Sequence, residues 1–155
     1  MELHRGDKEM ERGKEIVILD ASVVVKWFVD EEHTEAALTA RDDYRDGRTD
    51  IWSTQLLPFE VLNALRYNPG FGLDELKSAA RALEQYRLAL HPVLGEMAEV
   101  SATAAVDLGI TLYDAAYVAL AKTMGRKMYT ADEKLLAKAA KVKEVTHIEE
   151  YSPPS

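Results

Sequence analysis

The sequence predicts an α/β domain, a three-layer α/β/α sandwich with a mostly parallel central sheet. Short apolar runs of the kind buried in parallel strands alternate along the chain with longer segments whose apolar residues recur at helical spacing. Gly and Pro separate many of these segments. The length of 155 residues suits one domain, which can bury roughly two-thirds of its unfolded surface.

The first elements follow from apolar runs and breakers. The run IVILD at 16–20 predicts a buried strand that ends on a carboxylate. A helical pattern covers 33–46 and stops at Gly47, after which 50–53 is a short strand candidate. No element is assigned between the first strand and the first of these helices.

The middle of the chain is predicted from Pro and Gly positions. Pro58 stands where a first helical turn tolerates it, so it opens a helix that runs to about Tyr67. The sequence NPGFG at 68–72 is a loop, 73–88 is a helix, and the run around Leu90 is a brief strand.

Two helices, each followed by Gly, lead into the last elements. The first covers 96–108 before Gly109, and the second runs from 112 to about Gly125. The same criteria predict a strand at 127–130, a helix at 132–140 and a last strand at 144–148.

The ends of the chain differ in composition from the rest. Residues 1–15, MELHRGDKEMERGKE, are charged and nearly free of apolar side chains, so we expect a mobile extension there. The folded domain is expected at 16–150, and the tail YSPPS at 151–155 is expected to be loose.

Composition narrows the classes of protein. The net charge of −8 disfavours a protein that coats itself in nucleic acid, although Lys122 to Lys143 carries seven basic and two acidic residues. This basic stretch fits either the solvated faces of two helices or a rim that steers phosphates. No apolar run approaches the ~20 residues needed to span a bilayer, and without cysteine there is no thiolate metal site. We expect a cytoplasmic protein without a membrane partner.

Four carboxylates fall at the ends of predicted elements. Asp20 closes the first strand, Glu60 and Asp114 lie in the first turns of their helices, and Asp132 follows the strand KMYT. Ligands of parallel sheets bind beyond the carboxyl ends of the strands. These four side chains are therefore expected to converge on one edge.

Each carboxylate also has a local explanation. Asp114 could complete a capping box with Thr111, and Asp132 could cap the helix that follows it. Glu60 could interact with its helix dipole, and Asp20 could cap a turn through Ser22. These explanations stay open at the sequence level, but four independent caps would rarely all fall at one edge.

Convergence would have a chemical consequence. Four carboxylates in a partly desolvated site repel one another, and a divalent cation removes that penalty. A set of hard oxygen ligands without Cys or clustered His suits Mg²⁺ or Mn²⁺, and such a site activates water for phosphodiester hydrolysis. Thr130, two residues before Asp132, could hydrogen-bond a water or an acidic side chain there, or serve only as a β-former.

Four motifs, in order and covering about residues 16–148, resemble one known family. They are ILDASVVVKWF, LPFEVLNAL, GITLYDAAYVALAK and MYTADEKLLAKAA. Together they are similar to the PIN-domain ribonucleases, particularly the VapC-type toxins of prokaryotic toxin–antitoxin pairs. The resemblance places the acidic tetrad of that family on Asp20, Glu60, Asp114 and Asp132, and its hydroxyl position on Thr130.

The resemblance implies an activity and partners. It implies an α/β/α sandwich, a Mg²⁺- or Mn²⁺-dependent endoribonuclease, an RNA substrate, a VapB-like protein antitoxin and a homodimer. Asp20 and Asp114 would lead in holding the metal, with Glu60 and Asp132 orienting its waters. Lys26 and three further basic residues are candidates for flanking phosphates: Lys122, Arg126 and Lys127.

Two competing interpretations remain. A haloacid-dehalogenase-type phosphatase needs a second aspartate where this chain has Ser22, and a receiver domain needs an early acidic pair, so another acidic α/β phosphohydrolase fits poorly. The second alternative is a catalytically silent PIN-like binding module. The histidines give no rival site, because the DEEH run at 30–33 fits a solvated helix start, and His91 and His147 lie in predicted strands without ligand spacing.

Overall fold

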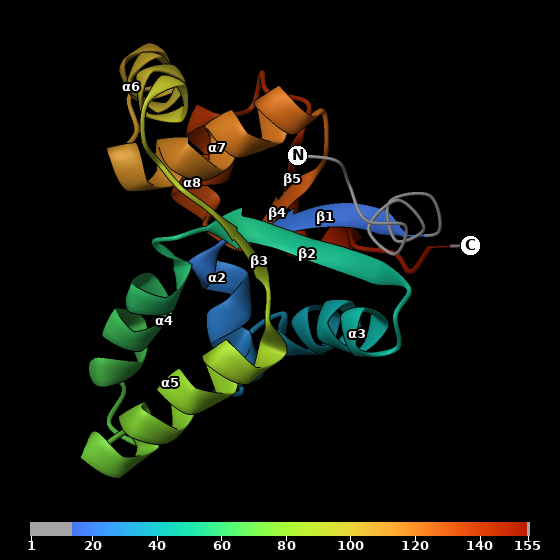
Figure 1. Cartoon of the computed structure of the whole chain (residues 1–155), viewed down its shortest axis with the longest axis vertical. Coiled ribbons are helices and arrows are strands. Elements are labelled where there is room, and N and C mark those ends of the chain that lie inside the picture. The colour runs from blue at the N-terminus through green and yellow to red at the C-terminus, as the bar shows by residue number, and fades with distance from the viewer. Residues whose placement is uncertain (1–13, 155) are drawn as a thin grey trace.

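A computed structural model of the chain describes residues 14–154 (Figure 1). Its strands are β1 (Glu15–Leu19), β2 (Thr49–Thr54), β3 (Ala89–His91), β4 (Met128–Thr130) and β5 (Val145–His147). Its α-helices are α2 (Ala21–Val24), α3 (Thr34–Arg45), α4 (Leu57–Arg66), α5 (Leu73–Tyr86), α6 (Glu96–Leu108), α7 (Leu112–Met124) and α8 (Glu133–Lys138). Two 3₁₀ helices complete it, η1 (Val25–Trp27) and η2 (Ile148–Glu150).

The strands form one parallel sheet in the order β3-β2-β1-β4-β5. The chain first moves outward from β1 through β2 to β3, and then returns to place β4 on the other side of β1. The strand order therefore reverses between β1 and β4. In open parallel sheets the crevice at the carboxyl side of such a reversal is the usual ligand site.

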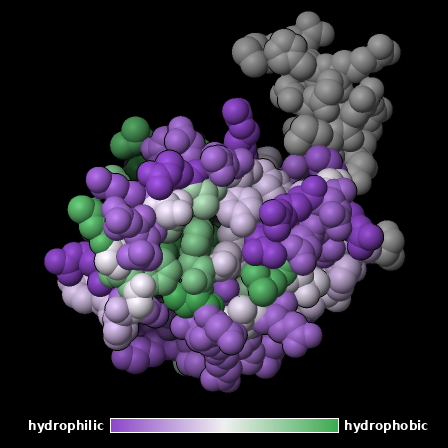
Figure 2. Space-filling view, turned by 90° about the horizontal axis from the view of Figure 1, so that it is seen from below, coloured by the Kyte–Doolittle hydropathy of each residue, from purple (hydrophilic) through white to green (hydrophobic). Residues whose placement is uncertain are grey.

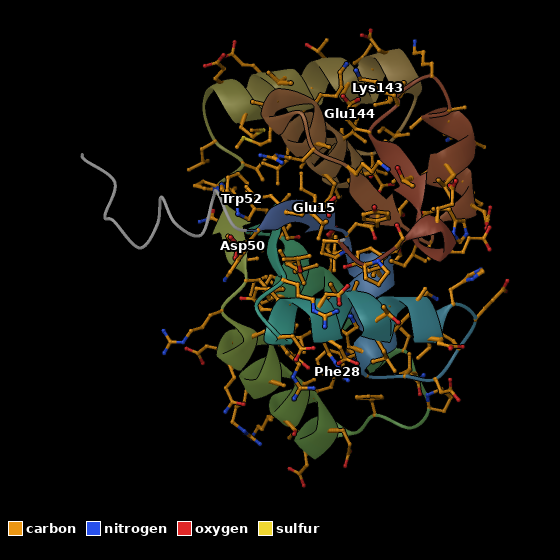
Figure 3. All side chains as sticks on the ribbon, turned by 90° about the vertical axis from the view of Figure 1, so that its right-hand side faces the viewer. Glu15, Phe28, Asp50, Trp52, Lys143 and Glu144 are labelled. Atoms are coloured by element: carbon orange, nitrogen blue, oxygen red, sulfur yellow. The ribbon has the colours of Figure 1, made fainter. Side chains whose placement is uncertain are left out.

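Helices cover both faces of this sheet, which confirms the predicted three-layer α/β/α fold. Figure 1 shows α6, α7 and α8 above the sheet and α2 to α5 below it. Alternate residues of β1 serve the two layers: Ile18 packs in the cluster of α7 and α8, whereas Val17 and Leu19 pack in the cluster below. Figure 3 places Phe28 in the lower layer and Lys143 and Glu144 in the upper one.

The predicted elements begin and end within about two residues of the observed ones, but α2 and the two 3₁₀ helices were not predicted. The sequence SVVVKW consists largely of strand-forming residues, yet it forms α2 and η1. The Asp20 side chain accepts a hydrogen bond from the Val23 N–H and so starts a helical turn directly after β1. The cap and the tertiary packing override the β propensity of the valines.

Both ends of the sheet domain are anchored one residue beyond the bounds 16–150. Glu15 of β1 pairs with Thr49 of β2, and the Tyr151 hydroxyl donates to Asp43 Oδ2 at 2.6 Å. Residues 1–13 and Ser155 lie outside the described residues. The division into an extension, a domain and a tail therefore remains a prediction.

No single helix within residues 14–154 is both long and apolar enough to cross a membrane. The pair α6 and α7, bent by 111° at the break between them, meets the length and composition criteria only when the two helices are taken together.

Candidate active site

The candidate site lies at the carboxyl edge of the sheet, where the strand order reverses. Asp20 directly follows β1, and Asp132 stands two residues after Thr130, the last residue of β4. Asp114 lies in the first turn of α7 and Glu60 in the first turn of α4. Figure 1 shows the starts of α2 and α4 close together at the end where β2 stops.

Asp20 is held by hydroxyl and backbone donors. The Ser22 hydroxyl donates to Asp20 Oδ1 at 2.6 Å, and the Val23 N–H reaches the same oxygen at 3.3 Å. Ser22 Oγ also accepts from the Ala131 N–H at 2.8 Å and lies 3.2 Å from Thr130 Oγ1. This network joins the end of β1 to the end of β4, and it leaves Asp20 only 4% exposed.

Glu60 reaches the site from below the sheet. It is half-buried on α4, and its Oε2 accepts a hydrogen bond of 2.6 Å from the Tyr117 hydroxyl. Tyr117 belongs to α7 on the opposite side of the sheet and is 1% exposed. This contact connects the two helical layers across the edge of the sheet.

Asp114 and Asp132 occupy helix starts, as their local explanations required. The Thr111 hydroxyl caps α7 by accepting from the Asp114 N–H at 3.1 Å. Asp132 Oδ1 caps α8 by accepting from the N–H groups of Lys134 and Leu135 at 3.0 and 3.1 Å. Capping and convergence are therefore compatible, because the helix starts themselves lie at the carboxyl edge.

The electrostatics show that the four acids are close enough to interact. Burial raises the pKa of Asp20 to about 6, and the Asp114 charge adds to the rise while hydrogen bonds from Ser22, Thr130 and Val23 oppose it. Burial raises the pKa of Glu60, with Asp114 again contributing.

Asp114 also interacts electrostatically with Asp132, the fourth acid. Burial raises the pKa of Asp114, and repulsion from Asp132 comes next. Within residues 14–154, none of the four carboxylates forms an ion pair with Lys, Arg or His. The site is therefore an acidic cluster without an ion-paired protein cation.

Three of the four basic residues proposed for flanking phosphates lie away from this site, and the fourth, Lys26, is paired with another acid. The Lys26 ammonium is 3.0 Å from Glu31 Oε1, and the residue is only 7% exposed. Lys127 precedes β4 and therefore lies at the opposite edge of the sheet, while Lys122 and Arg126 lie at the far end of α7 from Asp114. Strand and helix direction therefore carry Lys122, Arg126 and Lys127 away from the carboxyl edge, whereas the Lys26 ammonium is paired with Glu31.

Another basic residue does approach the acids. The Lys138 ammonium donates to the Gly109 carbonyl at 3.0 Å, and its charge lowers the pKa of Asp114, opposing the larger effects of burial and Asp132. The far end of the basic stretch, by contrast, leads into the amino end of β5 at Lys143 (Figure 3). The basic stretch is thus largely a solvated surface, with Lys138 as the member that reaches the site.

A separate cluster of possible metal ligands lies beside the end of β5. In the described part of the chain, it is the one group of three His, Cys, Asp or Glu residues with ligand atoms within 4.8 Å of one another: His33, His147 and Glu149. Its nitrogens are already engaged, because His147 Nδ1 accepts from the Glu149 N–H at 3.0 Å and Nε2 lies 3.1 Å from Glu133. The acidic tetrad is more widely spaced than this group.

Comparison with known proteins identifies the family. The family model described as PIN domain matches residues 17–142. The chain belongs to the PIN-domain family. Two curated relatives of this PIN domain come from Pyrobaculum aerophilum. Ribonuclease VapC3 is 32% identical over 127 residues, 79% of this chain and 93% of the relative, and Exonuclease VapC9 is 30% identical over 118 residues, 74% and 86% of the two chains.

A solved structure shares the fold of this PIN domain. It is a toxin–antitoxin complex from Klebsiella pneumoniae, with a TM-score of 0.64, 17% identity, and coverage of 87% of this chain and 99% of that chain. This likeness supports the fold, while the family model and the two relatives confirm the resemblance to VapC-type nucleases stated from the four motifs.

Sequence reasoning missed two contacts of this site. It did not connect Tyr117 with Glu60, which are 57 positions apart, and it placed Ser22 only as a small polar residue near Asp20. A signal for Tyr117 was present, because a buried phenol one turn after a site aspartate needs a polar partner.

Proposed function

We propose that this VapC-type PIN nuclease is an endoribonuclease that hydrolyses RNA phosphodiester bonds with a divalent cation held by Asp20 and Asp114, assisted by Glu60 and Asp132. The observation that supports this most strongly is the position of all four carboxylates at the carboxyl edge of the sheet, with no ion-paired Lys, Arg or His within residues 14–154. Burial, with a smaller contribution from a neighbouring acid of the set, raises the pKa of three of them. Such mutual repulsion is relieved when a cation binds between the acids.

The donor set fits Mg²⁺, with Mn²⁺ as an alternative. All four candidate ligands are carboxylates, and neither Cys nor His belongs to the set. No three of these four carboxylates have ligand oxygens within 4.8 Å of one another in the described residues. Such wide spacing suits an ion that keeps several of its waters and binds only one or two carboxylates directly. When bound, Mg²⁺ polarises a phosphoryl oxygen and lowers the pKa of a water.

The residues of the chain have separate tasks in this proposal. Asp20 is fixed by Ser22 and Val23, so its orientation is set before any ligand arrives. Thr130, fully buried, orders the loop by accepting from the Asp132 N–H at 3.1 Å. Glu60 and Asp132 orient water, and Lys138 offers a positive charge to a phosphate near Asp114.

We also propose a VapB-like antitoxin as the protein partner. A groove between α4 and α5 is lined by apolar and basic side chains, among them Phe59, Leu62 and Arg66, and Phe59 is 81% exposed. Figure 2, which views the molecule from the side of these helices, shows hydrophobic side chains gathered among hydrophilic ones. An exposed apolar surface of this kind is typical of a protein-binding site. Homodimer formation remains a prediction.

The alternative is a catalytically silent PIN-like binding module. The intact hydrogen bonds around Asp20 and Glu60 favour a working site instead. A binding module should show no stabilisation by Mg²⁺ or Mn²⁺.

RNA cleavage by the wild type and by Asp20→Asn and Asp114→Asn tests the proposal. We expect cleavage that depends on Mg²⁺ or Mn²⁺ in the wild type and none in either variant, while both variants melt at the wild-type temperature or above it. Asn retains the acceptor oxygen that bonds Ser22 and Val23, so the Asp20 variant separates charge from packing. Full cleavage by either variant would reject the assignment.

A further inference from the structure

Among residues 14–154, Tyr117 is the one buried side chain from the upper layer whose polar atom bonds an acid of the site. It stands three residues after Asp114 in α7, and its ring packs with Ile18 and Met128 above the sheet. Its hydroxyl donates to Glu60 Oε2 at 2.6 Å. A buried phenol has few rotatable bonds, so it can fix the oxygen that it contacts.

Glu60 needs such a partner more than Asp20 and Asp132 do. Asp20 and Asp132 are short side chains held by backbone N–H groups, whereas Glu60 has a longer side chain and is only half-buried. In the described part of the chain, its hydrogen bond from Tyr117 is the one side-chain contact recorded for its carboxylate. The other oxygen, Oε1, accepts no hydrogen bond from residues 14–154.

The phenol is itself supported from the sheet. Thr54, the last residue of β2, is 1% exposed, and its hydroxyl lies close enough to Tyr117 to lower the pKa of the phenol, against the larger effect of burial. Thr54 Oγ1 also accepts from the Leu56 N–H at 3.2 Å, at the turn that leads into α4. The Thr54 hydroxyl therefore lies where the end of β2, the start of α4 and the side chain of Tyr117 from α7 come together.

We infer that Tyr117 is a positioning residue of the nuclease site, which holds Oε2 of Glu60 and leaves Oε1 to serve the divalent cation. This inference rests on the function proposed above. Outer partners that orient a ligating carboxylate usually change metal affinity or activity by roughly 10- to 100-fold when removed. A merely structural hydrogen bond would change stability and leave both of these unaltered.

The chain supplies a matched control. The Tyr151 hydroxyl donates to Asp43 Oδ2 at the same distance of 2.6 Å, and Asp43 is buried like Asp20. This pair joins the C-terminal segment to α3 and does not include any of the four site carboxylates. Tyr151→Phe therefore removes a chemically equivalent bond away from the site.

The experiment compares Tyr117→Phe with Tyr151→Phe in the full chain. Mn²⁺ binding is followed by electron paramagnetic resonance of the free ion, and kcat and KM are measured for RNA cleavage. For Tyr117→Phe we expect Mn²⁺ affinity and kcat to fall about 10-fold or more while KM for RNA stays within about threefold. Tyr151→Phe should keep Mn²⁺ affinity and kcat within about twofold of the wild type.

A double variant shows whether Tyr117 acts through Glu60. In the Glu60→Gln background, adding Tyr117→Phe should cause no further loss of kcat, because the acid it orients is already gone. Equal losses in both backgrounds, or wild-type Mn²⁺ affinity and kcat in Tyr117→Phe, would overturn the inference. If Tyr117→Phe does not fold, Thr54→Val tests the same phenol from the side of the sheet. We expect Thr54→Val to lower Mn²⁺ affinity and kcat by less than the roughly 10-fold expected for Tyr117→Phe. No loss of either quantity would overturn the inference.

The two proposals fail in different ways. If the wild type shows no cleavage dependent on a divalent ion, or if Asp20→Asn retains it, then the proposed function itself is wrong. If those results are as expected and only Tyr117→Phe behaves like the wild type, then the site stands and Tyr117 serves packing alone.

Discussion

At the scale of single residues, Asp20 combines a structural and an electrostatic role. It caps α2 and accepts from Ser22, yet its burial raises its pKa to about 6. The position is thus built to hold a carboxylate whose ionised form is unfavourable without a cation nearby. This combination is typical of functional sites and unusual for a simple cap.

The raised pKa predicts how Asp20 affects stability in the metal-free protein. At about pH 3, below both pKa values, the carboxyl is largely protonated in the folded and unfolded chains alike, and its hydrogen bonds contribute fully. As the pH rises towards 6 the unfolded chain releases its proton first, so the free energy of unfolding falls, by at most about 3 kcal/mol. Asp20→Asn should therefore stabilise the metal-free chain by about 1–3 kcal/mol at pH 7.5 and by almost nothing at about pH 3.

Denaturant unfolding with a chelator at the two pH values measures this difference. Asp42→Asn is the matched control, because Asp42 is exposed on α3 and lies in none of the site contacts. A gain in stability for Asp20→Asn that is equal at both pH values would contradict the assigned pKa.

Asp132 allows capping to be separated from the proposed metal role. Its Oδ1 accepts from Lys134 and Leu135, which Asn can also do. Asp132→Asn should therefore keep the free energy of unfolding within about 0.5 kcal/mol, whereas Asp132→Ala should lower it by about 1 kcal/mol. Both variants should lose RNA cleavage to the same degree. Retained cleavage in Asp132→Asn would show that Asp132 is a cap and nothing more.

At the scale of elements, α7 carries Asp114 and Tyr117, so the way it packs determines where these two side chains lie. Its inward face carries small residues that are fully buried, Ala115, Ala116, Ala119 and Ala121. Small side chains let the helix approach the strands closely, which brings Asp114 and Tyr117 to the carboxyl edge. The small side chains of this helix therefore help to position the site residues.

Enlarging this face should displace the site. Ala116→Leu adds three carbons at a position with no exposure, so we expect a loss of about 1–3 kcal/mol in the free energy of unfolding. RNA cleavage by the folded fraction should fall as well, because Asp114 moves with the helix. Ala102→Leu on the exposed face of α6 is the control and should change stability by less than about 0.5 kcal/mol. Equal effects of the two variants would argue against close packing of α7.

The same elements show what the sequence could predict. Helices with Pro at the start or Gly after the end, such as α4, α6 and α7, were placed within two residues because these breakers act locally. The helix α2 was missed because its valines favour strands, and only the cap at Asp20 reveals it. The contact between Tyr117 and Glu60 depends on how two layers meet, which no local pattern encodes.

At the scale of the whole molecule, the strand order explains why four distant acids converge. The order β3-β2-β1-β4-β5 reverses beside β1, so Asp20 and Asp132 follow the ends of neighbouring strands although 112 positions separate them. The sequence predicted the edge from parallel-strand geometry, but it could not give the order of the strands. The convergence of the acids was therefore expected, and the place of the reversal was learned from the structure.

A cation at the acidic edge should stabilise the folded chain as a whole. At Mn²⁺ concentrations about 100 times the dissociation constant, the gain is about 2.7 kcal/mol if the unfolded chain does not bind the ion. We expect thermal melting to show this gain in the wild type and to lose it in Asp114→Asn. His147→Ala is the control, because it removes a ligand of the other cluster and should keep the Mn²⁺ effect.

The most direct test is a crystal structure of the protein soaked in Mn²⁺, with the ion located by its anomalous scattering. The central claim predicts a peak at the carboxyl edge of the sheet, coordinated by Asp20 or Asp114 and by water. A peak at His33, His147 and Glu149 alone, or no peak at saturating Mn²⁺, would contradict it.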